Sequence, residues 1–173
     1  MHLKIRHETV NDYAGIKKIN DLAFGQSVEG KLIDRLRKNP GYNEQLSIVA
    51  EIVGGIVGHI LFFPIKISDG EQNYESLSLG PMAVVPKYQG RGIGGKLILH
   101  GLKVGRDLGY RSVVVLGHKD YYPKFGFRPA SEWNIHAPFN VPDEAFMAIE
   151  LVVDGLKGMK GTVVYPKEIV EAV

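Results

Sequence analysis

The spacing of apolar residues changes several times along the chain, and each change marks a new element. Residues 2–7 alternate polar and apolar side chains, which predicts a short strand. Residues 9–12 resemble a capping box, and apolar positions at helical spacing continue the helix over residues 13–23. A second, shorter helix is predicted over residues 28–36 and ends at Asn39-Pro40-Gly41.

From residue 46 the pattern becomes typical of strands. Residues 46–52 and 56–67 are rich in β-branched and aromatic residues, and the glycine pair at 54–55 between them predicts a hairpin. A third strand is predicted over residues 75–84, where Gly80-Pro81 interrupts the run. Because proline has no N–H to donate, this pair predicts a bulge or a point where the strand leaves its neighbour.

The second half of the chain predicts a β-α-β unit. Apolar residues at helical spacing predict a helix over residues 92–108. Residues 112–116 form a continuous apolar run, as expected of a strand that is buried on both faces after a right-handed crossover. Residues 146–153 predict another strand, and we expect residues 154–173 to form a tail packed on the domain.

The amino-acid composition excludes several classes of protein and of functional site. The chain has 173 residues, 45% of them hydrophobic and 23% charged, which is typical of one soluble globular domain. A net charge of +2 is too small to indicate a nucleic-acid or membrane surface, but it suits a small anionic ligand. The absence of cysteine excludes a thiolate nucleophile, a disulfide and a cysteine zinc site. The apolar runs are short and the start lacks a signal sequence, so we expect a cytoplasmic protein.

The most informative stretch is a glycine-rich turn between a predicted strand and a predicted helix. Four of the six residues from Gly90 to Gly95 are glycine. At the N-terminus of a helix, unpaired N–H groups and the helix dipole favour an anion, and glycines let that anion approach the backbone. The turn therefore predicts a phosphate-binding site.

Three motifs fit this turn. Gly90, Gly92 and Gly95 match the dinucleotide fingerprint. However, Pro86 separates them from the preceding strand, and the acidic residue at the required distance, Asp107, lies on the predicted helix. The stretch also matches the first seven positions of a P-loop, but the eighth is leucine, which has no hydroxyl to coordinate magnesium. An NTPase is therefore disfavoured.

The third motif is the Q/R-x-x-G-x-G/A segment of the GNAT-type N-acetyltransferases. Residues 82–94 resemble the central motif of that superfamily, and residues 122–127 resemble its Tyr-x-x-x-Gly-Phe motif. The resemblance covers residues 1 to about 152 in the order of elements. Three further stretches resemble a bacterial subgroup of acetyltransferases with no assigned substrate: Leu79-Gly80-Pro81, Leu116-Gly117-His118 and Phe146 to Leu151.

The resemblance implies an α/β (α+β) fold. Its central sheet is mixed and mostly antiparallel, is flanked by helices, and splays between the strands at 75–84 and 112–116. The N-acetyltransferase domain is expected over residues 1–153, with residues 154–173 as a C-terminal tail on the same domain. Acetyl-CoA is the implied cosubstrate, and no metal is expected.

The resemblance also implies the cofactor-binding residues. In that family the pyrophosphate lies on the amides of the turn, and the pantetheine arm runs along the preceding strand. Residue 118 stands where the family commonly has an asparagine that contacts pantetheine. The cofactor-binding residues expected here are Met82, Ala83, Val84, Gln89, Gly90, Arg91, Gly92, Ile93, Gly94, Gly95 and His118.

Acetyl transfer from a thioester to an amine passes through an oxyanion and releases a thiolate. A free backbone N–H near the splay, that of Met82, is expected to stabilise the oxyanion. Tyr122 matches the tyrosine that protonates the thiolate in the family, and it is the expected catalytic residue. The base that deprotonates the amine stays open among Glu75, His59, His118 and Glu29, or a water molecule.

The resemblance places the acceptor amine near residues 25–37 and 139–146. Carboxylates beside apolar side chains in these stretches suit a cationic amine, so we expect a primary amine of a small molecule as the substrate. A CoA-binding regulatory module without turnover and a peptide or protein N-acetyltransferase stay open as alternatives. No nucleic-acid or membrane partner is expected, and a homodimer stays open.

Overall fold

The computed structural model describes residues 2–173 and divides the chain into two compact units. Unit 1 comprises Met1–Phe63, Gly80–Gly101 and Lys167–Val173, of which Met1 lies outside the described residues. Unit 2 comprises Pro64–Leu79 and Leu102–Pro166. The elements that contribute residues to both units are β3 (Gly55–Ser68), β4 (Asn73–Val84) and α3 (Ile93–Asp107).

Unit 1 has the strand order β1-β2-β3-β4. Strand β1 (Lys4–His7) pairs antiparallel with β2 (Ser47–Ile52), and β2 pairs antiparallel with β3. The predicted hairpin is confirmed, because Gly54 and Gly55 connect β2 to β3 with φ angles of 102° and 142°. Only glycine adopts such angles without strain.

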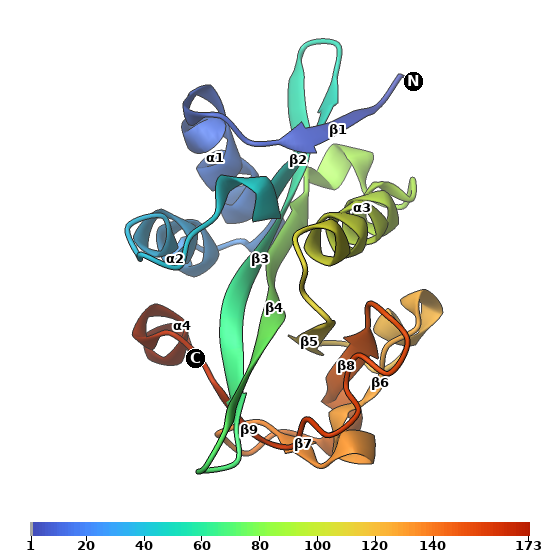
Figure 1. Cartoon of the computed structure of the whole chain (residues 1–173). Helices are drawn as coiled ribbons and strands as arrows, with labels where there is room; N and C mark the ends of the chain where they lie inside the picture. The colour runs from blue at the N-terminus through green and yellow to red at the C-terminus, as the bar shows by residue number, and fades with distance from the viewer. Residues whose placement is uncertain (1) are drawn as a thin grey trace. The chain divides into compact units, whose positions relative to one another are not determined.

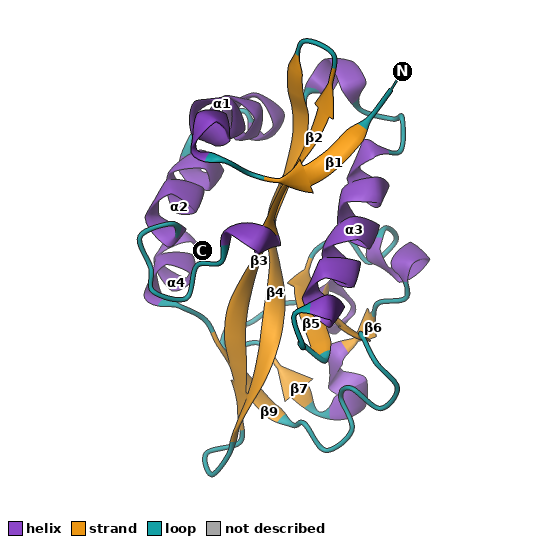
Figure 2. Cartoon of the chain, turned by 45° about the horizontal axis from the view of Figure 1, so that its top comes forward, coloured by secondary structure: helices purple, strands orange, loops and turns teal. Residues whose placement is uncertain are grey.

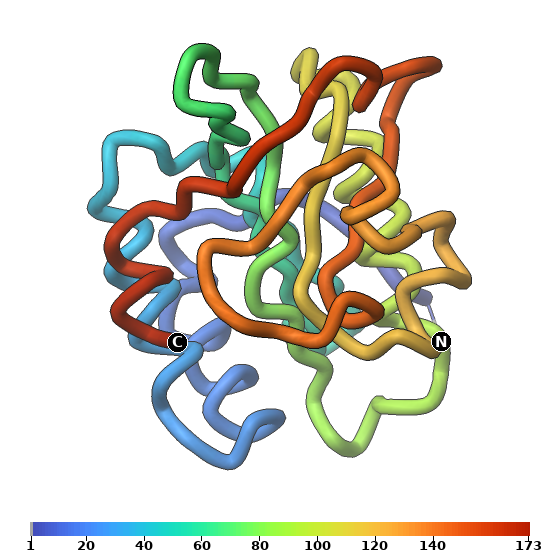
Figure 3. The backbone as a smooth tube through the Cα atoms, turned by 90° about the horizontal axis from the view of Figure 1, so that it is seen from below, coloured from blue at the N-terminus to red at the C-terminus, as the bar shows by residue number. Residues whose placement is uncertain are grey.

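Three helices of unit 1 lie together on one side of β2 and β3 (Figures 1 and 2). They are α1 (Tyr13–Phe24), α2 (Val28–Leu36) and α4 (Lys167–Ala172), and the first two confirm the helices predicted from periodicity. Figure 3 shows α4, in red, beside α2. The core under these helices is made of Ile16, Ile33, Leu36, Val49, Leu61 and Phe63.

Strand β3 presents its other face in unit 1 to the first part of α3. A Cβ atom on Gly58 would lie 3.1 Å from Leu97, and one on Gly101 would lie 2.0 Å from the Phe62 ring. The two glycines therefore allow a close approach of helix and strand. This packing, with Ile93 2% exposed, fixes the N-terminal end of α3.

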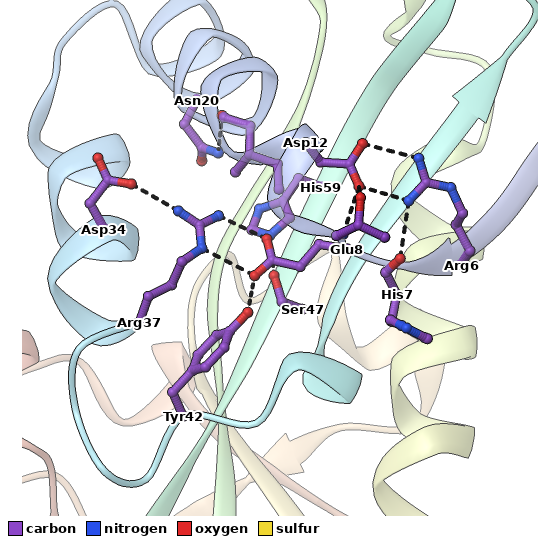
Figure 4. A network of polar contacts seen from close by, with 12 residues as sticks. Arg6, His7, Glu8, Asp12, Asn20, Asp34, Arg37, Tyr42, Ser47 and His59 are labelled. Carbon is purple, nitrogen blue, oxygen red and sulfur yellow. Dashed lines mark hydrogen bonds and ion pairs between the residues drawn. The ribbon is translucent and has the colours of Figure 1, made fainter.

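In unit 1 a buried ion pair joins Glu8, directly after β1, to Arg37 at the C-terminal end of α2 (Figure 4). The Arg37 guanidinium donates to Glu8 through Nη2 (2.8 Å) and Nε (3.1 Å), and through Nη1 to Asp34 (2.8 Å). The Tyr42 hydroxyl also donates to Glu8, and the guanidinium lies 3.8 Å from the centroid of the Tyr13 ring. The side chains of Arg37 and Glu8 are only 8% and 1% exposed, so removal of either one would leave the other charge buried without a partner.

The predicted capping box is also confirmed. The backbone N–H of Thr9 donates to the Asp12 carboxylate (2.8 Å) at the start of the short 3-10 turn Val10–Asp12 that leads into α1. Arg6 donates to the same carboxylate (2.7 Å), and this hydrogen bond is the main reason that the pKa of Asp12 is lowered. The bond ties the start of α1 to β1.

Unit 2 has the strand order β3-β4-β5-β8-β6, and its sheet is mixed. Strand β5 (Ser112–Leu116) pairs parallel with β4, which confirms the predicted crossover, and antiparallel with β8 (Phe146–Glu150). The shorter strands are β6 (Arg128–Pro129), which pairs with β8, and β7 (Ile135–His136) and β9 (Gly161–Val164), which pair with each other. Strand β9 also pairs antiparallel with β3.

The ladder between β4 and β5 is short. It ends at Ser78 and Val114, although β5 continues to Leu116 along β8. This confirms that the third predicted strand leaves a neighbour near Gly80-Pro81. Strand β4 itself runs on to Val84, and the Val85 N–H donates to the Val57 carbonyl of β3 (2.9 Å).

The strand predicted over residues 146–153 is too long. Strand β8 ends at Glu150, because the chain turns where the Gly155 N–H donates to the Val152 carbonyl (3.0 Å) and Asp154 has a φ angle of 58°. Strand β9 and helix α4 form within the segment expected to be a tail. The domain boundary at residue 153 stays a prediction.

We expect Arg37→Ala to lower the free energy of unfolding by about 3–5 kcal/mol, because it leaves the Glu8 carboxylate buried without its partner. Urea denaturation measures this change. Arg35→Ala, two residues earlier in the last turn of α2, is the matched control, since Arg35 pairs with Glu171 and both side chains are about half exposed (45% and 55%). The control should cost about 1 kcal/mol or less. Equal costs for the two variants would contradict the buried ion pair.

Candidate active site

The glycine-rich turn lies in unit 1, between the 3-10 turn Pro86–Tyr88 and α3. Gly90 and Gly92 have φ angles of 77° and 79°, and nothing lies within 4 Å of a Cβ atom on either. The first hydrogen bond of the helix runs from the Lys96 N–H to the Gly92 carbonyl (3.2 Å). The N–H groups of residues 93–95 precede that bond, so they have no partner within the helix. Such a turn can receive an anion.

Three cationic side chains surround this turn in sequence: Lys87, Arg91 and Lys96. None of them has an acidic partner among residues 2–173. The Arg91 guanidinium lies 5.2 Å from the centroid of the Tyr88 ring, and the Lys87 ammonium lies 5.7 Å from it. The unneutralised charges reinforce the preference of the turn for an anion.

The strand before the turn supplies backbone groups. Met82 and Val84 are half-buried, and Ala83 is 3% exposed. The side chain of Gln89 reaches back, and its Nε2 donates to the Val84 carbonyl (3.0 Å). Gln89 therefore fastens the turn to the end of β4 through its side chain.

Tyr122 lies in unit 2, at the start of the 3-10 turn Tyr122–Phe125. Its ring packs edge-on against Tyr121 and Phe127, with centroids 5.2 Å and 5.7 Å away. Burial, together with the neighbouring Tyr121, raises the pKa of Tyr122 to about 12. The phenol is therefore protonated at neutral pH and can donate a proton.

Gly117 is a residue whose importance the sequence pattern did not reveal. A Cβ atom on it would lie 2.3 Å from the Tyr122 ring, so any side chain here would displace the tyrosine. The Gly117 N–H donates to the Ala145 carbonyl (2.9 Å), which continues the β5–β8 pairing by one residue. A glycine directly after a buried strand is the signal that could have indicated a ring packed there. The adjacent His118 is exposed, and its carbonyl accepts from the Tyr121 N–H (3.1 Å).

The four candidate bases differ in burial. His59 is 0% exposed, and its Nε2 lies 2.8 Å from the Ser47 hydroxyl (Figure 4). Burial, aided by the charge of Arg37, lowers the pKa of His59 to about 3, so the ring is neutral and closed off from solvent. Glu75 is exposed and lies 3.8 Å from Lys66, and Glu29 accepts from Gln26 (2.9 Å). His118 is exposed as well, so burial argues only against His59.

The predicted cofactor-binding and catalytic residues are divided between the two units. Residues 82–95 are held together in unit 1 by β4, the turn and α3, and His118 and Tyr122 lie close in sequence in unit 2. Within residues 2–173, no group of three or more His, Cys, Asp and Glu side chains could hold a metal ion. No helix in that range is long and apolar enough to cross a membrane.

Known proteins share both sequence and fold with this chain. A model of the acetyltransferase (GNAT) domain matches residues 43–129. The uncharacterized N-acetyltransferase YjhQ of Escherichia coli is 39% identical over 136 residues, which cover 78% of this chain and 75% of YjhQ.

Two solved structures extend the likeness to nearly the whole chain. The E. coli GNAT family N-acetyltransferase YhbS, solved in complex with CoA, has a TM-score of 0.91 and 29% identity, and the match covers 98% of this chain and 93% of YhbS. A GNAT family acetyltransferase from Brucella melitensis, solved in complex with acetyl-CoA, has a TM-score of 0.79 and 35% identity. That match covers 97% of this chain and 98% of the Brucella protein.

Proposed function

Because the chain belongs to the acetyltransferase (GNAT) family, we propose that it transfers the acetyl group of acetyl-CoA directly to a primary amine of a small molecule. The observation that carries this proposal is the turn at Gly90 to Gly95, whose free amides precede the first hydrogen bond of α3. The complexes of YhbS with CoA and of the Brucella relative with acetyl-CoA support the choice of cosubstrate.

The pyrophosphate of acetyl-CoA is proposed to lie on the amides of the turn. Its negative charge suits the N-terminus of a 15-residue helix and the unpaired cations Lys87, Arg91 and Lys96. Ile93 would contribute through its N–H, because its side chain is buried against Gly58. Gln89 is proposed to hold the turn in shape, since its side-chain amide already donates to Val84.

The pantetheine arm is proposed to bind along Met82, Ala83 and Val84. These residues belong to the part of β4 beyond Ser78, where the ladder to β5 has ended. Backbone groups outside a ladder need other partners, and the amides of pantetheine can supply them as an added strand would. His118 is proposed to contact the same arm.

The transfer step needs an oxyanion donor and an acid. The amine nitrogen attacks the thioester carbon, and the resulting oxyanion is proposed to accept from the Met82 N–H. When the C–S bond breaks, the sulfur takes the electron pair and Tyr122 donates its proton to it. The amine gives up its proton to a base, for which water, His118, Glu75 and Glu29 are the solvent-accessible choices.

We expect Gly92→Val to abolish acetyl-CoA binding while the protein stays folded. A β-branched residue cannot adopt the φ angle of 79° at this position without strain, so the turn changes shape and its amides no longer converge. Isothermal titration calorimetry with acetyl-CoA measures the loss. Gly70→Val is the matched control, because Gly70 has a φ angle of 93° and open space around it in the turn between β3 and β4. Unchanged affinity in folded Gly92→Val would show that the turn is only structural.

Tyr122→Phe should lower kcat by about 100- to 10,000-fold with little change in acetyl-CoA affinity, because the phenol acts only when the thiolate leaves. The rate of CoA release in the presence of an amine measures kcat. Phe125→Leu, which alters the same 3-10 turn without removing a hydroxyl, is the control for packing. Full activity of Tyr122→Phe would move the acid role to Tyr121, His118 or solvent.

The acceptor class is tested with the same assay. A panel of small amines and peptides distinguishes the proposed small-molecule substrate from a protein N-terminus, and turnover confined to peptides would contradict the proposal. If acetyl-CoA binds but no acceptor releases CoA, the chain is a binding module instead of an enzyme.

A further inference from the structure

The backbone of residue 117 does not itself require glycine. Its φ angle is not positive, so a residue with a side chain could adopt the same conformation. The residue also continues the pairing of β5 with β8 through its hydrogen bond to the Ala145 carbonyl. Glycine at such a position leaves nothing to pack and loses more conformational entropy on folding than any other residue. The reason for glycine here must therefore lie in what surrounds it.

The neighbour that excludes a side chain from position 117 is the ring of Tyr122. A Cβ atom there would lie 2.3 Å from Cε2 of the ring, 2.9 Å from Cδ2 and 3.3 Å from Cζ. Carbon atoms in ordinary contact are about 3.5–4.0 Å apart, so even a methyl group would force the ring to move by about 1 Å. Because Cζ carries the hydroxyl, the phenolic oxygen would move with it.

The other contacts of Tyr122 give its ring a defined place in unit 2. Phe127, which is 1% exposed, and Tyr121 both pack edge-on against it. The backbone is held as well, because the N–H groups of Tyr121 and Tyr122 both donate to the His118 carbonyl (3.1 Å and 3.4 Å). Packing and the short turn together fix the ring against Gly117.

The Tyr122 hydroxyl, in contrast, is not held by a hydrogen bond. It has no partner within residues 2–173, and its oxygen is not one of the buried polar atoms that lack a partner. The oxygen is therefore accessible to a ligand. Since no hydrogen bond orients it, its position depends on the packing of the ring alone.

We propose that Gly117 is a positioning residue for acetyl transfer, because the absence of a side chain there sets the point at which Tyr122 offers its proton to the leaving sulfur. This inference rests on the proposed acetyl transfer. As the C–S bond breaks, the sulfur takes the electron pair and then the phenolic proton, and the phenolate recovers a proton from solvent. A general acid must lie within about 2.6–3.2 Å of the atom that it protonates, so a ring displaced by about 1 Å protonates the sulfur poorly.

The first test is Gly117→Ala. We expect kcat to fall about 100-fold, the loss that a misplacement of about 1 Å can cause. The Kd for acetyl-CoA should stay the same, because the turn proposed to bind it belongs to unit 1. CoA release from acetyl-CoA with 1-butylamine, a simple primary amine, measures kcat, and every amine of the acceptor panel that is turned over should show the same loss.

Gly105→Ala is the matched control for overpacking in unit 2. A Cβ atom on Gly105 would lie 2.9 Å from the buried Leu77 side chain, and no atom of Tyr122 lies within 4 Å of it. The control should keep the kcat of the unaltered protein. A comparable loss of kcat in Gly105→Ala would show that any crowding of unit 2 impairs the enzyme.

A double-mutant cycle distinguishes positioning from a merely structural role. Tyr122→Phe keeps the ring and its contact with Gly117 but has no proton to donate. If Gly117 acts through that proton, adding Gly117→Ala to Tyr122→Phe should change kcat less than about twofold. A structural defect would lower kcat by the same factor in both backgrounds, and that result would overturn the proposal.

The unaltered protein tests the contact without relying on the folding of a variant. NMR should show strong nuclear Overhauser effects between the Tyr122 ring protons and the Gly117 Hα protons, and their absence would overturn the proposal. Full kcat in folded Gly117→Ala would also overturn it, while a loss of kcat in Tyr122→Phe would leave the transfer step intact. If the unaltered protein releases no CoA with any amine, the acetyl transfer itself is refuted, and the inference with it.

Discussion

The end of the parallel ladder between β4 and β5 decides which backbone groups of β4 stay available to a ligand, and it lies two residues before Gly80-Pro81, where proline has no backbone N–H. The ladder includes Leu77 and Ser78 and then stops, although both strands continue. Backbone groups of Met82 to Val84 in unit 1, and of Val115 and Leu116 in unit 2, therefore lie outside it. Because unpaired backbone groups are costly, a break of this kind gives a physical reason for an amide-rich ligand such as the proposed pantetheine arm.

The turn that follows β4 depends on how closely α3 approaches β3. Gly101 leaves room for the Phe62 ring, and Gly58 leaves room for Leu97 and Ile93. With the helix fixed in this way, its first N–H groups have no partner within the helix. The positive φ angles of Gly90 and Gly92 set the path of the turn that leads into them. The opposite face of β3 is closed by α1 and α2, which hold the neutral, buried His59. One strand thus separates the proposed phosphate site from the structural core of unit 1.

The elements that were predicted correctly each show a clear pattern of apolar residues within their own sequence. Helices α1, α2 and α3 repeat apolar residues at helical spacing, and β5 is a continuous apolar run. Strand β9 and helix α4, with four and six residues, are too short for such a signal and depend on distant partners, such as the Asn39 amide that donates to Glu168 (2.9 Å). The turn was predictable because its four glycines fall within six residues of the sequence. The contact of the Tyr122 ring with Gly117 was not predictable, because it depends on how the 3-10 turn after β5 folds back on the strand end.

The turn and the strand before it are proposed to bind acetyl-CoA. The most direct measurement is the melting temperature of the protein with millimolar acetyl-CoA, compared with NAD and ATP at the same concentration. A ligand present at 100 times its Kd adds about 2.7 kcal/mol to the stability of the folded state, so acetyl-CoA should raise the melting temperature by several degrees. NAD and ATP should raise it less. No shift with acetyl-CoA, or a larger shift with NAD or ATP, would contradict the account.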